Sequence, residues 1–454
     1  MDDDRFHVKT LTLENFRCFE KTELGPFNPH FNLLVGENGS GKSSVLMALA
    51  DLFRPLARGE IAGDSLLGEK DVRLSDRAIP TAVTPTTASS RWVLTSEFDW
   101  NEGSFFAREN FDHISKKALP TRSLWRTPPG GRNLTDALAQ VQNYQVPWPG
   151  LIAFYTTDRR FLSVHDSVKG ASESSDVTLN LAFANWDNAG LHIDAFREWM
   201  RAETLISLQE GRFPKFNALD TAKLREHGAA PTISLLRIVQ DAICKAFEGA
   251  TAVEYVERRK DIVVYFENGA SQEFSKMSDG QRALAGLIGD VARRVCSIYE
   301  VPFGLEALTK APGLVLIDEL DLHLHPKWQR QIIGALKRIF PKIQFFATTH
   351  SPQVIGEARP EEIVLLTPQG QKRPMGSYGM DSNWVLECVM EAEGRNPDVA
   401  RRIRALFDAI DDGRFDEARA SIAALRKEIG DAPDLLGAES YIWRVEHEGD
   451  EAAQ

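Results

Sequence analysis

A glycine-rich segment between a short apolar run and a helical pattern constrains this chain more than any other feature. Residues 31–35 (FNLLV) are typical of a buried strand that ends at glycine, and apolar residues recur at helical spacing over 43–53. The segment between them fits GxxxxGK[ST], in which glycines let backbone N–H groups surround a phosphate at a helix N-terminus. The residues predicted to bind a nucleotide there are Gly36, Asn38, Gly39, Ser40, Gly41, Lys42, Ser43 and Ser44.

Four side chains near this loop have separate predicted tasks. Lys42 would neutralise charge on the β- and γ-phosphates, and the hydroxyl of Ser43 would bind Mg²⁺. A second buried strand, 314–317, ends in two carboxylates, Asp318 and Glu319. We expect Asp318 to hold the same Mg²⁺, while Glu319 orients and deprotonates the attacking water. The pattern therefore predicts ATP and Mg²⁺ as cofactors.

Two shorter motifs add groups that can contact the γ-phosphate. A third apolar strand, 343–348, is followed by His350, which can hydrogen-bond the γ-phosphate and position water. Another motif precedes an amphipathic helix, 40 residues before the carboxylate pair, where the helix dipole favours an anion. Alone, the motif before the helix also fits a capped helix start. A lone histidine such as His350 is usually structural. The residues of this signature are Ser278, Asp279, Gly280 and Gln281.

Along the chain, the glycine-rich loop (the P-loop), the signature, the carboxylate pair and His350 follow one another in an order that resembles the ABC-ATPase heads of the RecF/SMC group. The segments 11–17 (LTLENFR) and 318–326 (DELDLHLHP) are similar to the same group. The resemblance implies ATP hydrolysis by subunits that pair head-to-tail, so that the P-loop of one copy faces the signature of another. The loop residues would then act in cis and the signature residues in trans, in a homodimer or a higher homo-oligomer.

The order of the predicted elements gives an α/β fold class. Residues 252–274 read as an antiparallel meander, with a hairpin turn signal at Asn268-Gly269. Alternating buried strands and helices indicate a parallel sheet covered by helices. The resemblance implies an ABC-ATPase head with an antiparallel β-subdomain, split by a mostly helical insertion. We divide the chain into an N-terminal lobe with the P-loop, the insertion, a C-terminal lobe with the other motifs, and a helical tail: 1–162, 163–250, 251–368 and 369–454.

Chain length narrows the resemblance. About 235 residues separate the P-loop and the signature, without a sustained heptad run, whereas SMC and Rad50 proteins insert long coiled coils there. The tail lacks the acidic pattern of a TOPRIM nuclease. Instead, 151–160, 378–383 (YGMDSN) and a helical hairpin after Asn396 resemble the ATPase subunit of Septu and retron-associated anti-phage systems. That resemblance implies a defence ATPase that regulates an HNH-type nuclease partner.

Composition limits the partners and the compartment. The net charge of −12 excludes a chain-wide polyanion binder, so DNA would need a local basic patch. Residues 113–135 hold basic and no acidic side chains, which fits either a DNA contact or a solvated loop. Four widely spaced cysteines indicate reduced thiols in the cytoplasm. No apolar run reaches the ~20 residues of a membrane span.

The sequence leaves two rival functions open. One is a RecF-like DNA-repair clamp without a nuclease partner, and the other is a non-hydrolysing scaffold locked by ATP. A γ-phosphate sensor in the N-terminal lobe also remains unassigned. The glutamines before the strand at 151–156 have no convincing frame, and two arginines after it could contact phosphate or form surface ion pairs. These residues are Gln140, Gln142, Gln145, Arg159 and Arg160.

Overall fold

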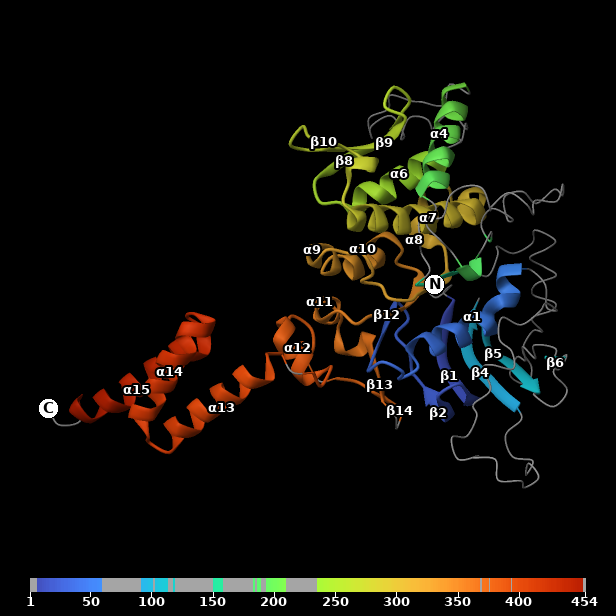
Figure 1. The fold of residues 1–454 in the computed structure, drawn as a ribbon. Coiled ribbons are helices and arrows are strands. Elements are labelled where there is room, and N and C mark those ends of the chain that lie inside the picture. Colours follow the sequence, from blue (N-terminus) through green and yellow to red (C-terminus); the bar gives the residue numbers. More distant parts are fainter. Residues whose placement is uncertain are drawn as a thin grey trace. The chain divides into compact units, whose positions relative to one another are not determined.

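The structure is a computed structural model of the 454-residue chain. The chain folds into two compact units, Met1–Asp381 and Ser382–Gln454 (Figure 1). No helix in the described ranges is long and apolar enough to cross a membrane. The structure describes residues 6–58, 91–100, 103–112, 117–118, 150–157, 183, 186–188, 193–209, 235–367, 370–374, 376–392 and 394–451.

A six-stranded sheet forms the centre of the first unit. Its order is β14-β13-β3-β12-β11-β7, and all neighbours are parallel except β14, which is antiparallel to β13. Four of the strands, β3, β7, β11 and β12, are buried along their whole length, as expected for a parallel sheet covered on both faces. The strands are β3 Phe31–Val35, β7 Leu151–Tyr155, β11 Gly313–Ile317, β12 Ile343–Thr348, β13 Ile363–Thr367 and β14 Gly370–Lys372.

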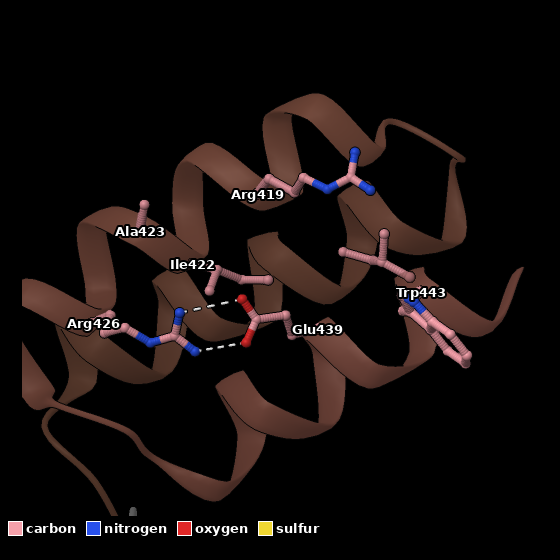
Figure 2. A pocket seen from close by; sticks show the side chains of 7 residues that line it. Arg419, Ile422, Ala423, Arg426, Glu439 and Trp443 are labelled. Atoms are coloured by element: carbon pink, nitrogen blue, oxygen red, sulfur yellow. Dashed lines mark hydrogen bonds and ion pairs between the residues drawn. The ribbon is translucent and has the colours of Figure 1, made fainter. Parts of the chain in front are cut away.

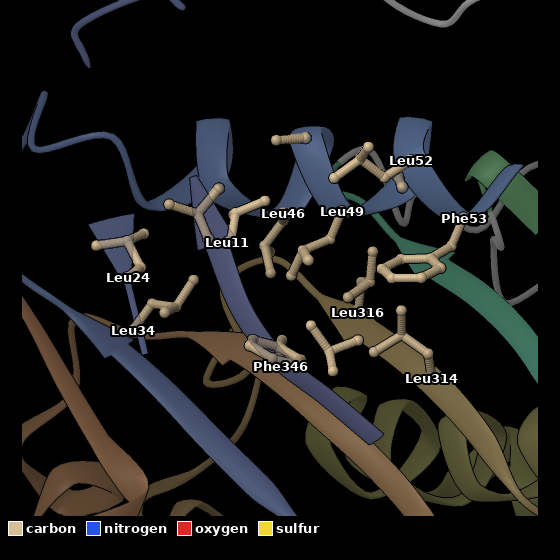
Figure 3. Close-up of a cluster of buried hydrophobic side chains, with 14 of the residues drawn as sticks. Leu11, Leu24, Leu34, Leu46, Leu49, Leu52, Phe53, Leu314, Leu316 and Phe346 are labelled. Carbon is tan, nitrogen blue, oxygen red and sulfur yellow. The ribbon is translucent and has the colours of Figure 1, made fainter. Parts of the chain in front are cut away.

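Helix α1 (Lys42–Arg58) lies between the parallel sheet and a second, antiparallel sheet (Figure 3). Leu46 and Leu49 of α1 join one buried cluster with Leu316 and Phe346 of the parallel sheet and Leu11 of the antiparallel sheet. Apolar contacts on two sides fix α1, and therefore fix the loop at its N-terminus. The second sheet has the order β2-β1-β4-β5-β6, from β1 His7–Phe16, β2 Phe19–Leu24, β4 Arg91–Trp100, β5 Gly103–Asp112 and β6 Lys117–Ala118.

A third, antiparallel sheet lies beside three helices (Figure 1). Its turn at Asn268-Gly269 has the predicted hairpin geometry: Gly269 has φ +78°, and Asn268 Oδ1 accepts a hydrogen bond from Ala270 N at 3.0 Å. Helix α7 packs on α4, α6 and β7, so it connects this region to the central sheet. These elements are β8 Ala250–Val256, β9 Asp261–Phe266, β10 Ser271–Glu273, α4 Ile193–Gln209, α6 Leu235–Ala246 and α7 Asp279–Phe303.

Short helices connect the elements of the first unit. The 3₁₀ helices are η3 Trp186–Asn188, η4 Phe274–Lys276, η5 Gly304–Glu306 and η6 Pro360–Glu362. The α-helices are α8 Ala307–Lys310, α9 Pro326–Gln329, α10 Ile332–Ile339 and α11 Pro352–Ile355. Of these, α9 and α11 follow the carboxyl ends of β11 and β12, where the predicted site residues lie.

The second unit is helical, and three long helices share a core of their own. Asn396 caps α13 by accepting a hydrogen bond from Asp398 N at 3.0 Å, with Pro397 in the first turn. A third helix extends the predicted hairpin, because its buried residues, Leu435 among them, face the other two helices. The helices are α12 Ser382–Cys388, α13 Pro397–Asp411, α14 Phe415–Ile429 and α15 Pro433–Glu451.

Two observed boundaries differ from the limits we expected. The sheet continues past residue 368, because β14 pairs with β13, and Gly379 N donates to Gly356 O at 2.8 Å. The division between compact units therefore falls after Asp381. Ala250, the last residue of the expected insertion, already begins β8. Most of 163–192 and all of 210–234 lie outside the described residues.

Candidate nucleotide site

The loop between β3 and α1 depends on its glycines. Gly36, Gly39 and Gly41 have φ of +155°, +84° and +97°, which side chains with a Cβ rarely adopt. A Cβ on Gly36 would lie 2.7 Å from Leu366 O, and one on Gly41 would lie 2.4 Å from the Phe19 ring. The glycines therefore keep the backbone wrapped close to the start of α1, and only glycine fits at positions 36 and 41.

Ser40 and Lys42 carry polar groups that suit a phosphate. The Ser40 hydroxyl oxygen is buried and has no hydrogen-bond partner among the described residues. Lys42 Nζ donates to Gly36 O at 2.8 Å and to Glu37 O at 2.9 Å. Burial lowers the pKa of Lys42, although the carboxylate of Asp318 counteracts this shift. An unpartnered hydroxyl and a buried ammonium are what an anion at this loop would satisfy.

Ser43 and Asp318 meet at the start of α1, although 275 residues separate them. Ser43 Oγ donates to Asp318 Oδ1 at 3.1 Å, and Thr348 Oγ1 donates to the same oxygen at 2.6 Å. One hydroxyl and one carboxylate side by side form the oxygen donor set that Mg²⁺ prefers. The pair therefore fits the magnesium position predicted for these two residues.

Thr348 also holds the turn after β11. Its hydroxyl oxygen accepts from Glu319 N at 2.7 Å, and its carbonyl accepts from Leu320 N at 2.8 Å. Glu319 thus follows Asp318 at the carboxyl edge of the sheet with its backbone anchored. Sequence reasoning did not assign Thr348 a role, although its place at the end of β12 was the available signal.

His350 lies in the exposed loop that follows β12. The next residue, Ser351, caps α11 by accepting from Gln353 N at 3.1 Å, and its own hydroxyl donates to Gln329 Oε1 at 2.8 Å. The neighbouring Thr349 donates to Asp321 Oδ1. These contacts tie the loop that carries His350 to the segment after β11, so both lie at the same edge of the sheet.

The signature residues form the first turn of α7. Ser278 N donates to Gln281 Oε1 at 3.1 Å, and Ser278 Oγ accepts from Gln281 N at 3.3 Å, which makes a capping box. Asp279 pairs with Arg282 beside it. Ser278 and Asp279 are exposed, whereas Gly280 is buried. The helix therefore presents its N-terminus and the Ser278 side chain to solvent.

Gly280 packs directly on the backbone that follows β11. A Cβ at this position would lie 2.8 Å from His323 O and 3.1 Å from His325 N. Within one chain, the signature thus contacts the segment after the carboxylate pair. Only glycine permits this approach. The packing therefore explains why position 280 needs glycine, which the motif pattern alone does not.

The tip of the β1–β2 hairpin covers the loop, and sequence reasoning gave it no role beyond a resemblance. The Cys18 Sγ would lie 2.7 Å from a Cβ on Gly41, next to Phe19. Arg17 Nη1 lies 3.5 Å from Ser44 Oγ, in the first turn of α1. The segment 11–17 was the only signal in the sequence for this contact. Asn38 and Gly39 lie on the exposed side of the loop.

Several sequence-based candidates fall outside this site. Among residues 113–135, the structure describes only Lys117–Ala118, and only their backbone. Gln140, Gln142, Gln145, Arg159 and Arg160 lie outside the described residues. A cavity of about 240 Å³ in the second unit lies between α14 and α15, where Arg426 pairs with Glu439 at 2.7 Å (Figure 2). None of its lining residues belongs to the nucleotide motifs.

The fold and the site define an α/β P-loop ATPase of the RecF/SMC-like ABC type. A family model described as "AAA domain, putative AbiEii toxin, Type IV TA system" matches residues 31–356. That match extends from β3 to the residues after His350 and includes all four motifs. The chain therefore belongs to this family.

Curated relatives match nearly the full length of the chain. It is 27% identical over 515 residues to the Retron Ec83 probable ATPase of Escherichia coli, an alignment that covers 99% of this chain and 90% of the relative. It is 22% identical over 392 residues to the Septu protein PtuA of Bacillus thuringiensis, covering 85% and 83%. These matches confirm the resemblance to the ATPases of retrons and to a Septu protein, and the chain is an ATPase.

One solved structure with a similar fold is titled "Crystal structure of the SmcHead bound to the C-winged helix domain of ScpA". It is 15% identical, with a TM-score of 0.44, and the match covers 81% of this chain and 97% of that chain.

Proposed function

We propose that this ATPase closes head-to-tail with a second copy around two Mg·ATP and controls an effector nuclease in anti-phage defence. The observation that carries the proposal is the division of the site. Ser43 and Asp318 converge within one chain, whereas the exposed Ser278 bonds to its own helix turn. A solvent-facing helix N-terminus suits the γ-phosphate of a nucleotide held by another copy.

The residues in cis would bind Mg·ATP and activate the attacking water. Lys42 would exchange its two loop carbonyls for phosphate oxygens, and the Ser40 hydroxyl would gain the partner that it lacks. Ser43 and Asp318 would hold Mg²⁺, which when bound neutralises charge on the β- and γ-phosphates. Glu319 would orient and deprotonate water for in-line attack, since its backbone is anchored at the carboxyl edge of the sheet. His350 would position that water from the neighbouring loop.

The residues in trans would make closure depend on the γ-phosphate. Ser278, with the amides of Asp279, Gly280 and Gln281, would donate to the γ-phosphate bound in the other copy. Hydrolysis would remove these contacts and open the pair, so that the arrangement of the two subunits would depend on whether ATP or ADP is bound. A nuclease partner that binds the closed pair but not the open one would then be regulated by ATP hydrolysis.

The relatives support the biological setting. Their names place them in retron and Septu systems, and the matching tail led us to expect an HNH-type nuclease partner. DNA is a further proposed ligand of the complex. Co-purification of this chain with the product of the adjacent gene, followed by a mass measurement, tests for the partner. Recovery of the ATPase alone from cells that also express that product would contradict it.

Glu319→Gln is the sharpest test of the ATPase mechanism. The amide keeps the shape of the side chain but cannot accept a proton, so turnover should fall by about 10²–10⁴-fold. ATP should then remain bound, and dimers should accumulate, as measured by light scattering with Mg·ATP. The control is Lys42→Ala combined with Glu319→Gln, which should stay monomeric. Normal turnover would remove Glu319 as the base, and a monomer with retained ATP would contradict head-to-tail closure.

A further inference from the structure

A largely buried polar cluster joins β7 to α7. Tyr155, the last residue of β7, donates its hydroxyl to Asp290 Oδ2 at 2.8 Å. Arg294 Nε donates to the same oxygen at 2.7 Å, and Arg293 Nη2 donates to Oδ1 at 2.7 Å. Tyr155 is 0% exposed and Arg294 is 3% exposed. One carboxylate therefore collects three donors in the interface between the edge strand and the long helix.

The backbone of Tyr155 leads directly to the proposed magnesium site. Asp318 N donates to Tyr155 O at 2.8 Å, one step beyond the last ladder pair, Ile317 with Tyr155. The side chain of Asp318 accepts from Ser43. Tyr155 thus bonds through its carbonyl to the carboxylate residue and through its hydroxyl to α7.

The other end of this connection is the signature. Helix α7 begins with the Ser278 cap and carries Asp290 about three turns later, so roughly 18 Å of helix separates them at 1.5 Å rise per residue. A helix of 25 residues moves as a rod over this length. A force on the exposed N-terminus of α7 would therefore reach the Asp290 carboxylate and the tyrosine that it holds.

Physical chemistry makes this cluster hard to break. Separating the partners of a buried ion pair leaves an uncompensated charge away from water, which is strongly unfavourable, so such a pair resists separation. Burial alone would raise the pKa of Asp290, but Arg294 and Arg293 hold it well below its usual range. Burial, together with the charge of Asp290, raises the pKa of Tyr155 well above 10. The carboxylate stays ionised and the hydroxyl keeps its proton, so their bond persists at neutral pH.

We propose that Tyr155 and Asp290 are positioning residues for ATP hydrolysis, because their bond links the signature helix to the magnesium carboxylate of the same chain. Tyr155 fixes where the backbone of Asp318 lies, and Asp290 fixes Tyr155 against α7. The transmission of a displacement along α7 depends on the proposed head-to-tail closure. The positioning of Asp318 by Tyr155 does not, because both residues lie within one chain.

Tyr155→Phe tests the link with the least disturbance, since it removes only the hydroxyl. We expect kcat to fall on the order of tenfold, because small misplacement of a catalytic group is costly, while KM for ATP stays unchanged. The Mg²⁺ concentration for half-maximal activity should rise severalfold. Tyr299→Phe is the matched control: this buried tyrosine also lies in the α7 region, stacked on Phe303 at 5.4 Å between ring centroids. It should leave kcat and the Mg²⁺ requirement unchanged.

Asp290→Asn gives a second, independent measurement. If the two residues act through one bond, Tyr155→Phe combined with Asp290→Asn should lower kcat no further than the more severe single variant. Additive losses would overturn the link, as would a Tyr155→Phe protein with the kcat and Mg²⁺ requirement of the unmodified chain. Mg²⁺-dependent binding of ATP to the isolated chain separates the two ideas. The Mg²⁺ concentration that this binding requires should still rise in Tyr155→Phe, with ATP affinity at saturating Mg²⁺ unchanged, even if Glu319→Gln fails to form dimers.

Discussion

Two residues after β11, Glu319 and His323, adopt left-handed backbone, with φ of +50° and +64°. Such a conformation in a residue other than glycine costs about 1–3 kcal/mol and persists only where the surroundings fix it. Thr348 supplies that restraint at Glu319 by accepting from its amide. At His323 the carbonyl lies against Gly280. The strained turn therefore includes the proposed base, Glu319, and extends to His323, which contacts the signature.

Gly280→Ala should disturb this turn without damaging the helix. The added methyl group would meet backbone atoms of His323 and His325 at 2.8 and 3.1 Å, and backbone cannot move aside as a side chain can. We expect ATPase activity to fall at least about tenfold while ATP affinity stays within about threefold, since the P-loop is untouched. Steady-state kinetics and nucleotide titration measure the two quantities.

Gly334→Ala is the matched control for this prediction. Gly334 is exposed inside α10, and a Cβ there would meet nothing within 4 Å. Because alanine favours a helix over glycine by about 0.8–1 kcal/mol, that variant should be slightly more stable and fully active. A Gly280→Ala protein that hydrolyses ATP at the unmodified rate would show that the close approach has no catalytic consequence.

For single residues, the sequence predicts which ones belong to the site more reliably than it predicts which side chains contact one another. The pairing of Ser43 with Asp318 could be expected, because both follow parallel strands whose carboxyl ends share one edge. The bridging role of Thr348 depends on side-chain geometry that no spacing reveals. The packing of Phe19 on Gly41 depends on how a distant hairpin folds over the loop, which local patterns do not encode.

Among the elements, the three long helices of the second unit form the clearest independent body. Leu406 of α13, Ile422 of α14 and Leu435 of α15 are each at most 2% exposed and belong to one apolar core. Among the residues that the structure describes, none of the first unit belongs to this core. The helices therefore owe their stability to one another, since isolated helices of this length are marginal in water.

Leu406→Ala should destabilise this unit alone. Removing a buried leucine side chain from a packed core costs about 2–5 kcal/mol. We expect faster hydrogen exchange over α13–α15 and a lower unfolding temperature for that unit, with unchanged exchange in α1 and the P-loop. Phe407→Ala provides the control, because its neighbouring side chain is 39% exposed and its loss should cost far less. Equal destabilisation of the P-loop region would contradict the independence of the two cores.

The elements that the sequence predicts are those with a strong apolar period. Continuous apolar runs identify β3, β11 and β12, whereas β14 (GQK) contains no large apolar side chain and forms a strand by pairing with β13. Helix α15 escaped a specific prediction for a similar reason. Its three inward residues are embedded among acidic ones, and it also exposes large apolar side chains, with Trp443 63% exposed. Tertiary contact decides both cases.

On the scale of the whole molecule, the two units differ in net charge. Residues 382–454 contain seventeen acidic and nine basic side chains, which is most of the net charge of −12. A surface of that sign repels a phosphate backbone. We therefore expect any DNA contact of the complex to come from residues before 382 or from the partner, with the acidic unit free for protein contacts.

The strongest whole-molecule prediction concerns two half-sites from two copies. Lys42→Ala removes the phosphate-binding charge, and Ser278→Arg places a bulky side chain at the signature, so each variant alone should be nearly inactive. In a closed two-fold pair, a mixed dimer of the two variants contains one site with an intact P-loop and an intact signature. An equal mixture should therefore recover about a quarter of the unmodified activity, because half of the dimers are mixed and half of their sites are intact.

A double variant shows whether such recovery comes from complementary halves. Mixing Lys42→Ala with the combined Lys42→Ala and Ser278→Arg chain offers no intact P-loop in any dimer, so activity should stay at background. If both half-sites of one nucleotide belonged to the same chain, no mixture could restore a site, and the first mixture would match the sum of its two components. Recovery in the first mixture and its absence in the second would together require that each ATP is bound between subunits, which makes the ATPase active only as an assembly.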